Sequence, residues 1–211
     1  MSPLPAAPAG RGCGRRYAGH FRSAGRQKPH AYHHARRQQV LSQQRPAGAS
    51  EPAPQDTIIF PGANAALRSV FHLKASSTLL AWELYCLGRP VINETFSHGT
   101  LESRLEVWVD DEPRLIERQH LGDGDLTPVA GHPWIGTLLF YPANEEHLDT
   151  VRALLAPLGH FAGATLTDEL LSVRFLSHDN LICQRVMRDI WQSLRPLLTT
   201  KTACSPRIWQ T

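Results

Sequence analysis

The sequence lacks the short motifs that mark the common catalytic and nucleotide-binding folds. It contains no Walker-type loop, no G-x-S-x-G nucleophile elbow and no C-x-x-C pair. The segment GDGDL (122–126) has two glycines, but they lie in a turn between predicted strands with no helix behind them, which argues against phosphate binding. No set of a nucleophile and a base points to an enzyme.

Long apolar runs and cysteines are also scarce. No stretch approaches the roughly 20 apolar residues of a membrane helix, and the first ten residues, MSPLPAAPAG, lack the apolar run of a signal peptide. Cys13, Cys86, Cys183 and Cys204 are scattered, a pattern typical of free or buried thiols in a reducing compartment. We therefore expect a soluble cytoplasmic protein that does not associate with membranes.

Acidic residues are almost missing from the first quarter of the chain. Residues 1–55 carry nine arginines and lysines and a single acid, Glu51, with few large aliphatic side chains. Such a segment cannot bury enough apolar surface to offset the roughly 1–2 kcal/mol per residue that ordering a backbone costs, so we predict that it is mostly disordered. The chain as a whole has a formal charge of +3, so residues 56–211 are mildly acidic. A nucleic-acid role would rest on the basic tail alone.

Residues 56–211 are predicted to form a second, mainly β domain. Short apolar runs are separated by turn segments such as DDEP and GDGD. The predicted strands cover 58–60, 69–73, 79–87, 104–109, 114–121 and 136–141. The segment GATLTDELLSVRFL (163–176) is typical of a hairpin of two further strands.

Two α-helices are predicted in the C-terminal half. The segment ANEEHLDTVRALLAPL (143–158) has Asn144 as its N-cap, acids in its first turn and an apolar stripe. The segment SHDNLICQRVMRDIWQSLRPLL (177–198) has Asp179 as its N-cap and apolar residues at helical spacing. From Gly136 onward the predicted order is therefore strand, helix, strand, strand, helix.

Histidines are plentiful but dispersed. The densest group, His30, His33 and His34, lies in the basic tail. A metal site needs several ligands held about 2 Å from the ion by a rigid frame, so a solvated tail is favoured over a ligand cluster there.

One acid lies inside an apolar strand. In TLLAWELYCLGRP (78–90), one face of the strand carries Leu80, Trp82, Leu84 and Cys86, and the other carries Leu79, Ala81, Glu83, Tyr85 and Leu87. The first face is core and the second is mostly apolar, so we expect Glu83 to be only partly in contact with water. An unpaired buried carboxylate is costly. A structural ion pair, with Arg89 or Arg104, is favoured over a functional acid, and both remain open.

Glu117 in PRLIERQHL (113–121) raises the same question. On a strand, Arg118 and His120 point away from it, so His120 does not chelate beside it unless a bulge intervenes. A salt bridge to an arginine of a neighbouring strand is favoured, and spacing alone leaves a functional role open.

Several segments together resemble one known family. The runs TIIFPGANAALRSVFHL, TLLAWELYCLGRP, SRLEVWVDDEPRLIERQHL, GHPWIGTLLFYPA and the terminal ACSPRIWQT occur in the order seen in the urease accessory protein UreD, also called UreH. The resemblance is continuous from Asp56 to Thr211. It implies a β-rich, helical-ramp-like stack of strands with two helices, and no catalysis.

The resemblance also implies a function in nitrogen metabolism. UreD proteins are scaffolds, or metallochaperones, that bind apo-urease with UreF and the GTPase UreG and help to insert nickel. No cofactor is expected to bind tightly, and nickel(II) is expected in transit along an internal passage. Glu83 and Glu117 fall where members carry acids associated with that passage, so they are the candidate nickel residues. Carboxylate oxygens hold such an ion reversibly, which suits a conduit.

The first part of the chain departs from the family pattern. The segment GHFRSAGRQ (19–27) is similar to a family segment, whereas residues 28–54 lose the expected alternation. We expect a UreD-like chain without the usual N-terminal third, whose sheets would have unpaired edges.

Three other functional classes remain as alternatives. They are a β-rich interaction module, an enzyme of unknown type and a nucleic-acid-binding protein that uses the basic tail. The last lacks the aromatic stacking residues with basic interleaving that such proteins use. Near the end, Trp209 is expected to pack into the core, because aromatic side chains bury large areas.

Overall fold

The computed structural model describes residues 49–50 and 56–198. The predictions for most of the basic tail, including the histidine group at 30–34, lie outside the described residues. So do those for Trp209, Cys13 and Cys204.

The described residues form two open β-sheets and two helices, which confirms the predicted fold class. The seven-stranded sheet has the order β1-β4-β8-β10-β9, with β2 and β5 also paired to β4. Its strands are β1 (Ala49–Ser50), β2 (Thr57–Ile59), β4 (Thr78–Arg89), β5 (Glu94–Thr95), β8 (Trp134–Tyr141), β9 (Ala162–Thr167) and β10 (Leu170–Ser177). The three-stranded sheet has the order β3-β6-β7, with β3 (Asn64–Leu73), β6 (Thr100–Val109) and β7 (Glu112–Gly122).

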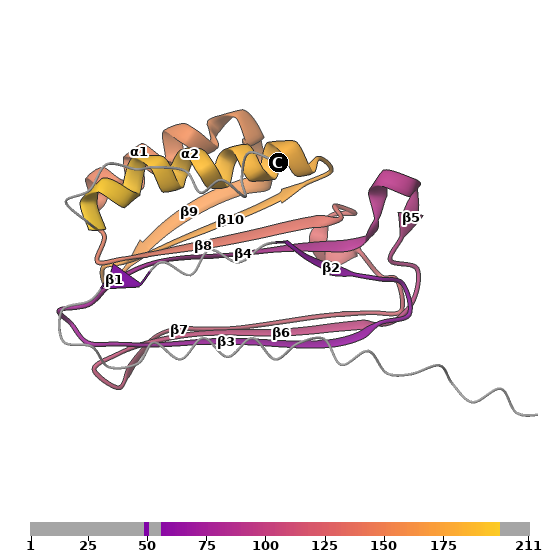
Figure 1. Ribbon diagram of the computed structural model, residues 1–211, viewed down its shortest axis with the longest axis horizontal. Helices are drawn as coiled ribbons and strands as arrows, with labels where there is room; N and C mark the ends of the chain where they lie inside the picture. Colours follow the sequence, from indigo (N-terminus) through magenta and orange to yellow (C-terminus); the bar gives the residue numbers. More distant parts are fainter. Residues whose placement is uncertain (1–48, 51–55, 199–211) are drawn as a thin grey trace, which may run out of the picture. The chain divides into compact units, whose positions relative to one another are not determined.

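The helices and the two sheets are arranged in layers (Figure 1). Helices α1 (Glu145–Leu155) and α2 (Asn180–Leu198) cover one face of the seven-stranded sheet, and the three-stranded sheet faces its other side. Short 3₁₀ segments η1 (Pro90–Ile92), η2 (Thr127–Val129) and η3 (Ala156–Phe161) connect the elements. Among the described residues, neither helix is long and apolar enough to span a membrane.

Local sequence signals set the turns and the helix starts. Both two-residue hairpin turns have positive φ at each central residue, Asp110–Asp111 and Asp168–Glu169, as a type I′ turn requires. The Asn144 side chain accepts from the N–H of His147, whose ring accepts from the N–H of Asn144, so the predicted cap of α1 is confirmed as a capping box. The carboxylate of Asp179 accepts from the N–H of Leu181 at 2.7 Å, as expected for the cap of α2.

Strand β4 is buried on both faces. Its Leu80, Trp82, Leu84 and Cys86 face joins the apolar cluster beneath the helices, as predicted. Its other face packs against the three-stranded sheet, where Leu79, Ala81 and Leu87 are no more than 2% exposed. Glu83 on this face is partly exposed, as expected, while its apolar neighbours are covered by the second sheet.

The two described cysteines are buried thiols, as their apolar surroundings predicted. Cys86 and Cys183 are 1% and 0% exposed and belong to the cluster beneath the helices. Burial raises the pKa of Cys86 to about 12 and that of Cys183 to about 11. Both groups are therefore protonated, unreactive core side chains near neutral pH.

Candidate functional site between the two sheets

A band of polar side chains crosses the space between the two sheets. Across the seven-stranded sheet, Glu83 of β4 is directly opposite Thr137 of β8, and Thr137 is directly opposite Arg174 of β10. Across the three-stranded sheet, the pairing joins Ser69 of β3 to Leu105 of β6, and Leu105 to Glu117 of β7. One row of residues in each sheet thus supplies the band.

Hydrogen bonds and an ion pair connect the two rows. The Ser69 hydroxyl donates a short hydrogen bond to Glu83. At the other side, the Arg174 guanidinium donates two hydrogen bonds to Glu117, one of them from Nε to Oε1 at 3.1 Å. The band therefore ties β3 to β4 and β7 to β10, so each sheet holds the other in register by polar contacts as well as apolar packing.

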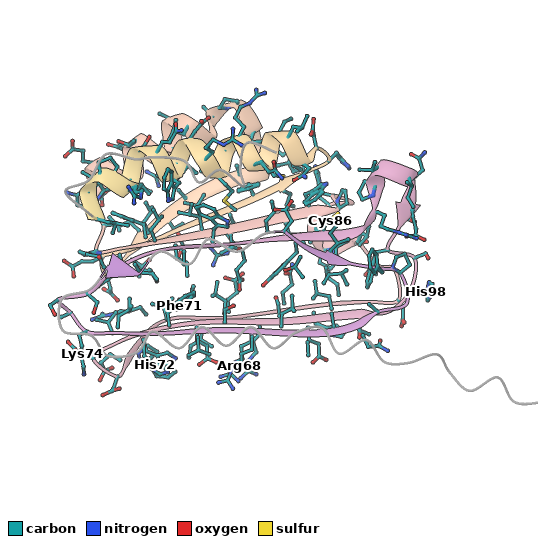
Figure 2. The ribbon with its side chains drawn as sticks, viewed as in Figure 1. Arg68, Phe71, His72, Lys74, Cys86 and His98 are labelled. Carbon is teal, nitrogen blue, oxygen red and sulfur yellow. The ribbon has the colours of Figure 1, made fainter. Side chains whose placement is uncertain are left out.

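Apolar clusters lie on both sides of the band. One contains Ile59, Ala65, Leu67, Tyr85, Leu87, Phe96, Leu101, Leu121, Val129 and Ile135. The other contains Phe71, Leu73, Leu79, Ala81, Leu105, Val107, Val109, Leu139, Tyr141 and Leu170. Figure 2 shows Phe71 of this second cluster pointing into the space between the sheets. Burying the charge of Glu83 costs free energy, so packing alone does not account for an acid at this position, whereas the Glu117 and Arg174 side chains are each 36% exposed.

The structure brings together the two acids that the sequence singled out, and it corrects their partners. Arg89 pairs with Glu94 and Arg104 with Glu106, so the predicted ion pair of Glu83 with Arg89 or Arg104 is wrong. Glu83 instead accepts hydrogen bonds from the hydroxyl groups of Ser69 and Tyr85.

The partner of Glu117 also differs from the expected one. Glu117 is salt-bridged, as favoured, but to Arg174 in the opposite sheet and not to an arginine of a neighbouring strand. As predicted, Arg118 and His120 lie on the other face of β7, where His120 contacts Glu102. Ser69 and Arg174 were missed as members of the site. The only signal for them was a polar residue at an inward position of an otherwise apolar strand.

The electrostatics of the band centre on Glu83. Burial raises the pKa of Glu83 and the nearby charge of Glu117 raises it further, while hydrogen bonds from Ser69 and Tyr85 and the charge of Arg174 lower it, with a net rise. Burial, together with the charge of Glu83 and its hydrogen bond, also raises the pKa of Tyr85. The surroundings of Glu83 thus disfavour its negative charge and favour either a proton or a counter-cation.

Comparison with known proteins places the chain in a family. The family described as UreD urease accessory protein matches residues 12–210. The chain belongs to this family. This confirms the resemblance seen in the sequence.

Individual relatives agree with the family match. UreD of Enterobacter sp. (strain 638) is 76% identical over 158 residues, which cover 75% of this chain and 58% of that protein. UreD of Klebsiella aerogenes is 67% identical over 166 residues, covering 79% and 62%. UreD of Pseudomonas putida (strain GB-1) is 48% identical over 158 residues, covering 75% and 57%. The alignments thus span about three fifths of the length of these UreD relatives.

The donor atoms of the band in this UreD chain are all hard oxygens. Carboxylates of Glu83 and Glu117 and the hydroxyl groups of Ser69 and Tyr85 belong to it. Within the described residues, no group of three or more His, Cys, Asp or Glu side chains is arranged to hold a metal ion. The band therefore offers oxygen contacts to a cation from two sheets without a complete ligand shell from these side-chain types.

The raised pKa of Glu83 gives a stability prediction for this UreD chain. In the folded chain the pKa of Glu83 is raised, so its carboxyl group keeps its proton at pH values above 4.5, the ordinary pKa of a glutamate. The folded state then binds more protons than the unfolded state, so stability falls as the pH rises from 4.5 through the folded pKa and stays reduced above it. The Glu83→Gln variant keeps the acceptor for Ser69 and carries no charge. We expect it to be at least as stable as the wild type at pH 7 and to lose this decline.

Urea unfolding between pH 4.5 and 8 measures the effect. Glu146→Gln, on the exposed side of α1, is the matched control and should follow the wild-type pH profile. A Glu83→Gln variant that is less stable than the wild type, by an amount that grows with pH, would show that the ionised carboxylate stabilises the fold.

Proposed function

We propose that this protein is a non-catalytic scaffold for urease maturation. In this role it binds apo-urease together with UreF and UreG and assists the insertion of nickel(II) into the urease active site. Membership of the UreD family supports the urease part of the proposal. Because the relatives are longer, the partners and the nickel role of the whole protein are carried over as part of this proposal.

The observation that carries the nickel role is the convergence of Glu83 and Glu117. The two acids come from different sheets and share a polar band with Arg174 between two apolar clusters. Placing the charge of Glu83 in this band costs free energy, which a purely structural interior of the same shape would avoid by using an apolar residue. A passage for a cation explains why charged and polar side chains occupy this position between the sheets.

The chemistry of the band fits an ion in transit. Nickel(II) binds imidazole and thiolate more tightly than a few carboxylate and hydroxyl oxygens, so oxygen contacts hold it loosely enough to release. Burial raises the pKa of Glu83, so a proton and a cation compete for its carboxylate, and a proton helps the cation to leave. Glu117 is already neutralised by Arg174, so Glu83 is the first contact and Glu117 the second.

Co-expression tests the scaffold. The affinity-tagged full chain is produced with the urease structural subunits, UreF and UreG, and recovered at moderate salt. We expect these proteins to co-purify in amounts that survive a raised salt concentration. Recovery of nucleic acid alone, lost as the salt is raised, would instead support the basic-tail alternative and contradict the scaffold.

A further inference from the structure

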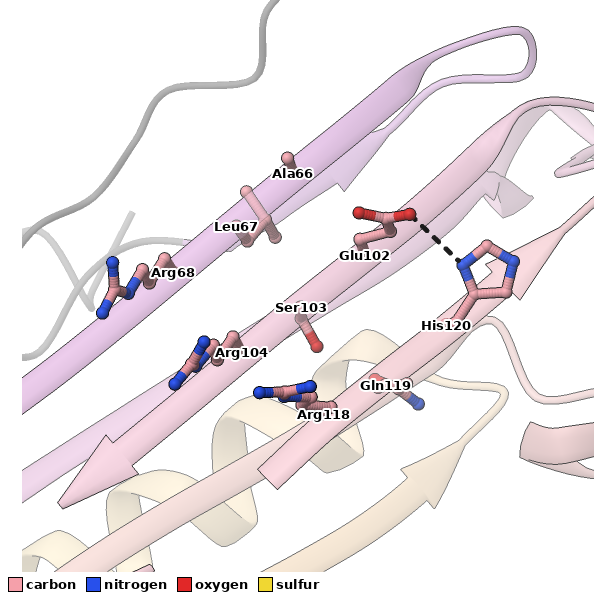
Figure 3. A pocket seen from close by; sticks show the side chains of 9 residues that line it. All are labelled: Ala66, Leu67, Arg68, Glu102, Ser103, Arg104, Arg118, Gln119 and His120. Carbon is pink, nitrogen blue, oxygen red and sulfur yellow. Dashed lines mark ion pairs between the residues drawn. The ribbon is translucent and has the colours of Figure 1, made fainter. Parts of the chain in front are cut away.

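The outer face of the three-stranded sheet carries an arginine from each strand in one row. Arg68 of β3 is directly opposite Arg104 of β6, and Arg104 is directly opposite Arg118 of β7. Neighbouring strands are about 4.8 Å apart, so three like charges stand side by side, an arrangement that is unfavourable unless anions compensate it. Figure 3 shows the three guanidinium groups side by side at one end of a surface hollow.

The compensation within the sheet is incomplete. One acid, Glu106, serves both Arg68 and Arg104, with N–O distances of 3.3 Å and 2.5 Å. The indole of Trp108 also donates to Glu106, which is only 3% exposed. In spite of the short distance, the Nε–H of Arg104 has no aligned acceptor among the described residues.

Arg118 is the uncompensated member of the row. Its side chain is exposed, and it has no hydrogen-bond or ion-pair partner in the part of the chain that the structure describes. The hollow in front of the row has a volume of about 530 Å³, and Glu102 and His120, which contact each other, line its other end. The guanidinium groups of the row therefore have N–H donors without acceptors in the described segments of the chain, and the hollow in front of them can hold the acceptor atoms of a ligand.

We propose that this row docks an acidic segment of a partner protein, whose side-chain carboxylates bind Arg118 and Arg104. Arginine forms paired hydrogen bonds with carboxylates and is enriched at protein interfaces. Beside the row on the same face, Ile116 is 50% exposed and Trp108 is partly exposed, which provides apolar contact for a protein segment. This docking role goes beyond the nickel passage and uses the opposite face of the sheet.

Charge on the same face selects a carboxylate segment over other anions. Glu102 and Glu106 flank the row, so a multiply charged phosphate or a nucleic acid would bring dense negative charge against two acids. Single carboxylates on a peptide can contact the guanidiniums one at a time and keep away from these acids. Protein carboxylates are therefore the favoured ligand, and phosphate is the competing outcome of the test.

A labelled peptide of six glutamates, titrated against the full chain by fluorescence anisotropy, tests the proposal. Arg118→Gln removes one cation without breaking an internal contact, and Arg185→Gln, at an exposed position of α2, removes one cation elsewhere. The two glutamine variants each lower the net charge of the chain by one. Any nonspecific attraction of the peptide, including that of the basic residues in 1–55, therefore falls equally in both. Arg118→Lys keeps the charge and loses the paired hydrogen bonds.

We expect Arg118→Gln to weaken binding about tenfold, Arg118→Lys to weaken it by an intermediate factor and Arg185→Gln to weaken it less than about twofold. We also expect inorganic phosphate to displace the peptide no better than chloride at equal ionic strength. The proposal is overturned if the wild type does not bind or if the two glutamine variants are equally affected. Selective displacement by phosphate would likewise overturn it and assign the row to small oxyanions.

Discussion

Replacing Gly136 by valine is expected to be the most damaging single substitution in the described core. Gly136 lies in the middle of β8, opposite Leu84 of β4 and Phe175 of β10. A Cβ atom there would come within 2.2 to 2.6 Å of three ring atoms of Phe175. That ring is 2% exposed and packed beneath the helices, so it has no free space to move into.

The expected cost of Gly136→Val is about 3 kcal/mol or more, the upper range for overpacking a dense core. Urea unfolding measures it, and Gly163→Val is the matched control. Gly163 lies in the edge strand β9, and a Cβ atom there would meet nothing within 4 Å. We expect the control to change the free energy of unfolding by less than about 0.5 kcal/mol. Equal stability of the two variants would show that β8 and β10 are not packed in this way.

Much of the fold was readable from the sequence because it depends on local signals. Short apolar runs between turn segments predicted the strands at 104–109 and 114–121, and the structure extends them to β6 (Thr100–Val109) and β7 (Glu112–Gly122). The caps Asn144 and Asp179 predicted the two helix starts, because an N-cap is a contact between residues two or three apart. Turn residues predicted the hairpins for the same reason.

The stacking of the sheets was not predictable from these signals. The face of β4 that carries Glu83 has the same alternation whether water or a second sheet lies against it. The pairing of β3 with β6 is parallel, so these strands are joined by a long connection that no turn motif announces. The two faces of β4 were therefore assigned correctly, while the cover of the second face was missed.

The prediction of the ion-pair partners of Glu83 and Glu117 was wrong for a related reason. Arg89 was a plausible partner of Glu83 by sequence distance, but it bonds Glu94 across a two-residue strand pair at 2.8 Å. Glu117 and Arg174 are 57 positions apart and meet only because β7 lies against β10. Contacts between sheets depend on how whole sheets are positioned, and one sequence does not encode that in any short pattern.

The second large effect is expected on urease activation when nickel is scarce. If Glu83 and Glu117 are successive contacts for the ion, removing either one removes a charge-assisted contact worth about 1.4 kcal/mol and lowers ion occupancy about tenfold. Glu83→Ala and Glu117→Ala should each reduce the activity of co-expressed urease by about this factor at limiting nickel. Glu146→Ala, an exposed acid on α1, should leave it unchanged.

Folding defects are separated from passage defects by the nickel dependence. Glu117→Ala leaves Arg174 without its carboxylate, so the amount of soluble chain is measured for every variant. A poorly folded scaffold lowers activation at all nickel concentrations, whereas a weakened passage is relieved by mass action when nickel is abundant.

The most direct test of the account is urease activity matured by the Glu83→Ala/Glu117→Ala double variant over a range of nickel concentrations, at equal amounts of soluble chain. The account predicts a loss of activation of at least about tenfold at limiting nickel that is largely recovered at saturating nickel. Wild-type activation by the double variant at limiting nickel would contradict the passage between the sheets.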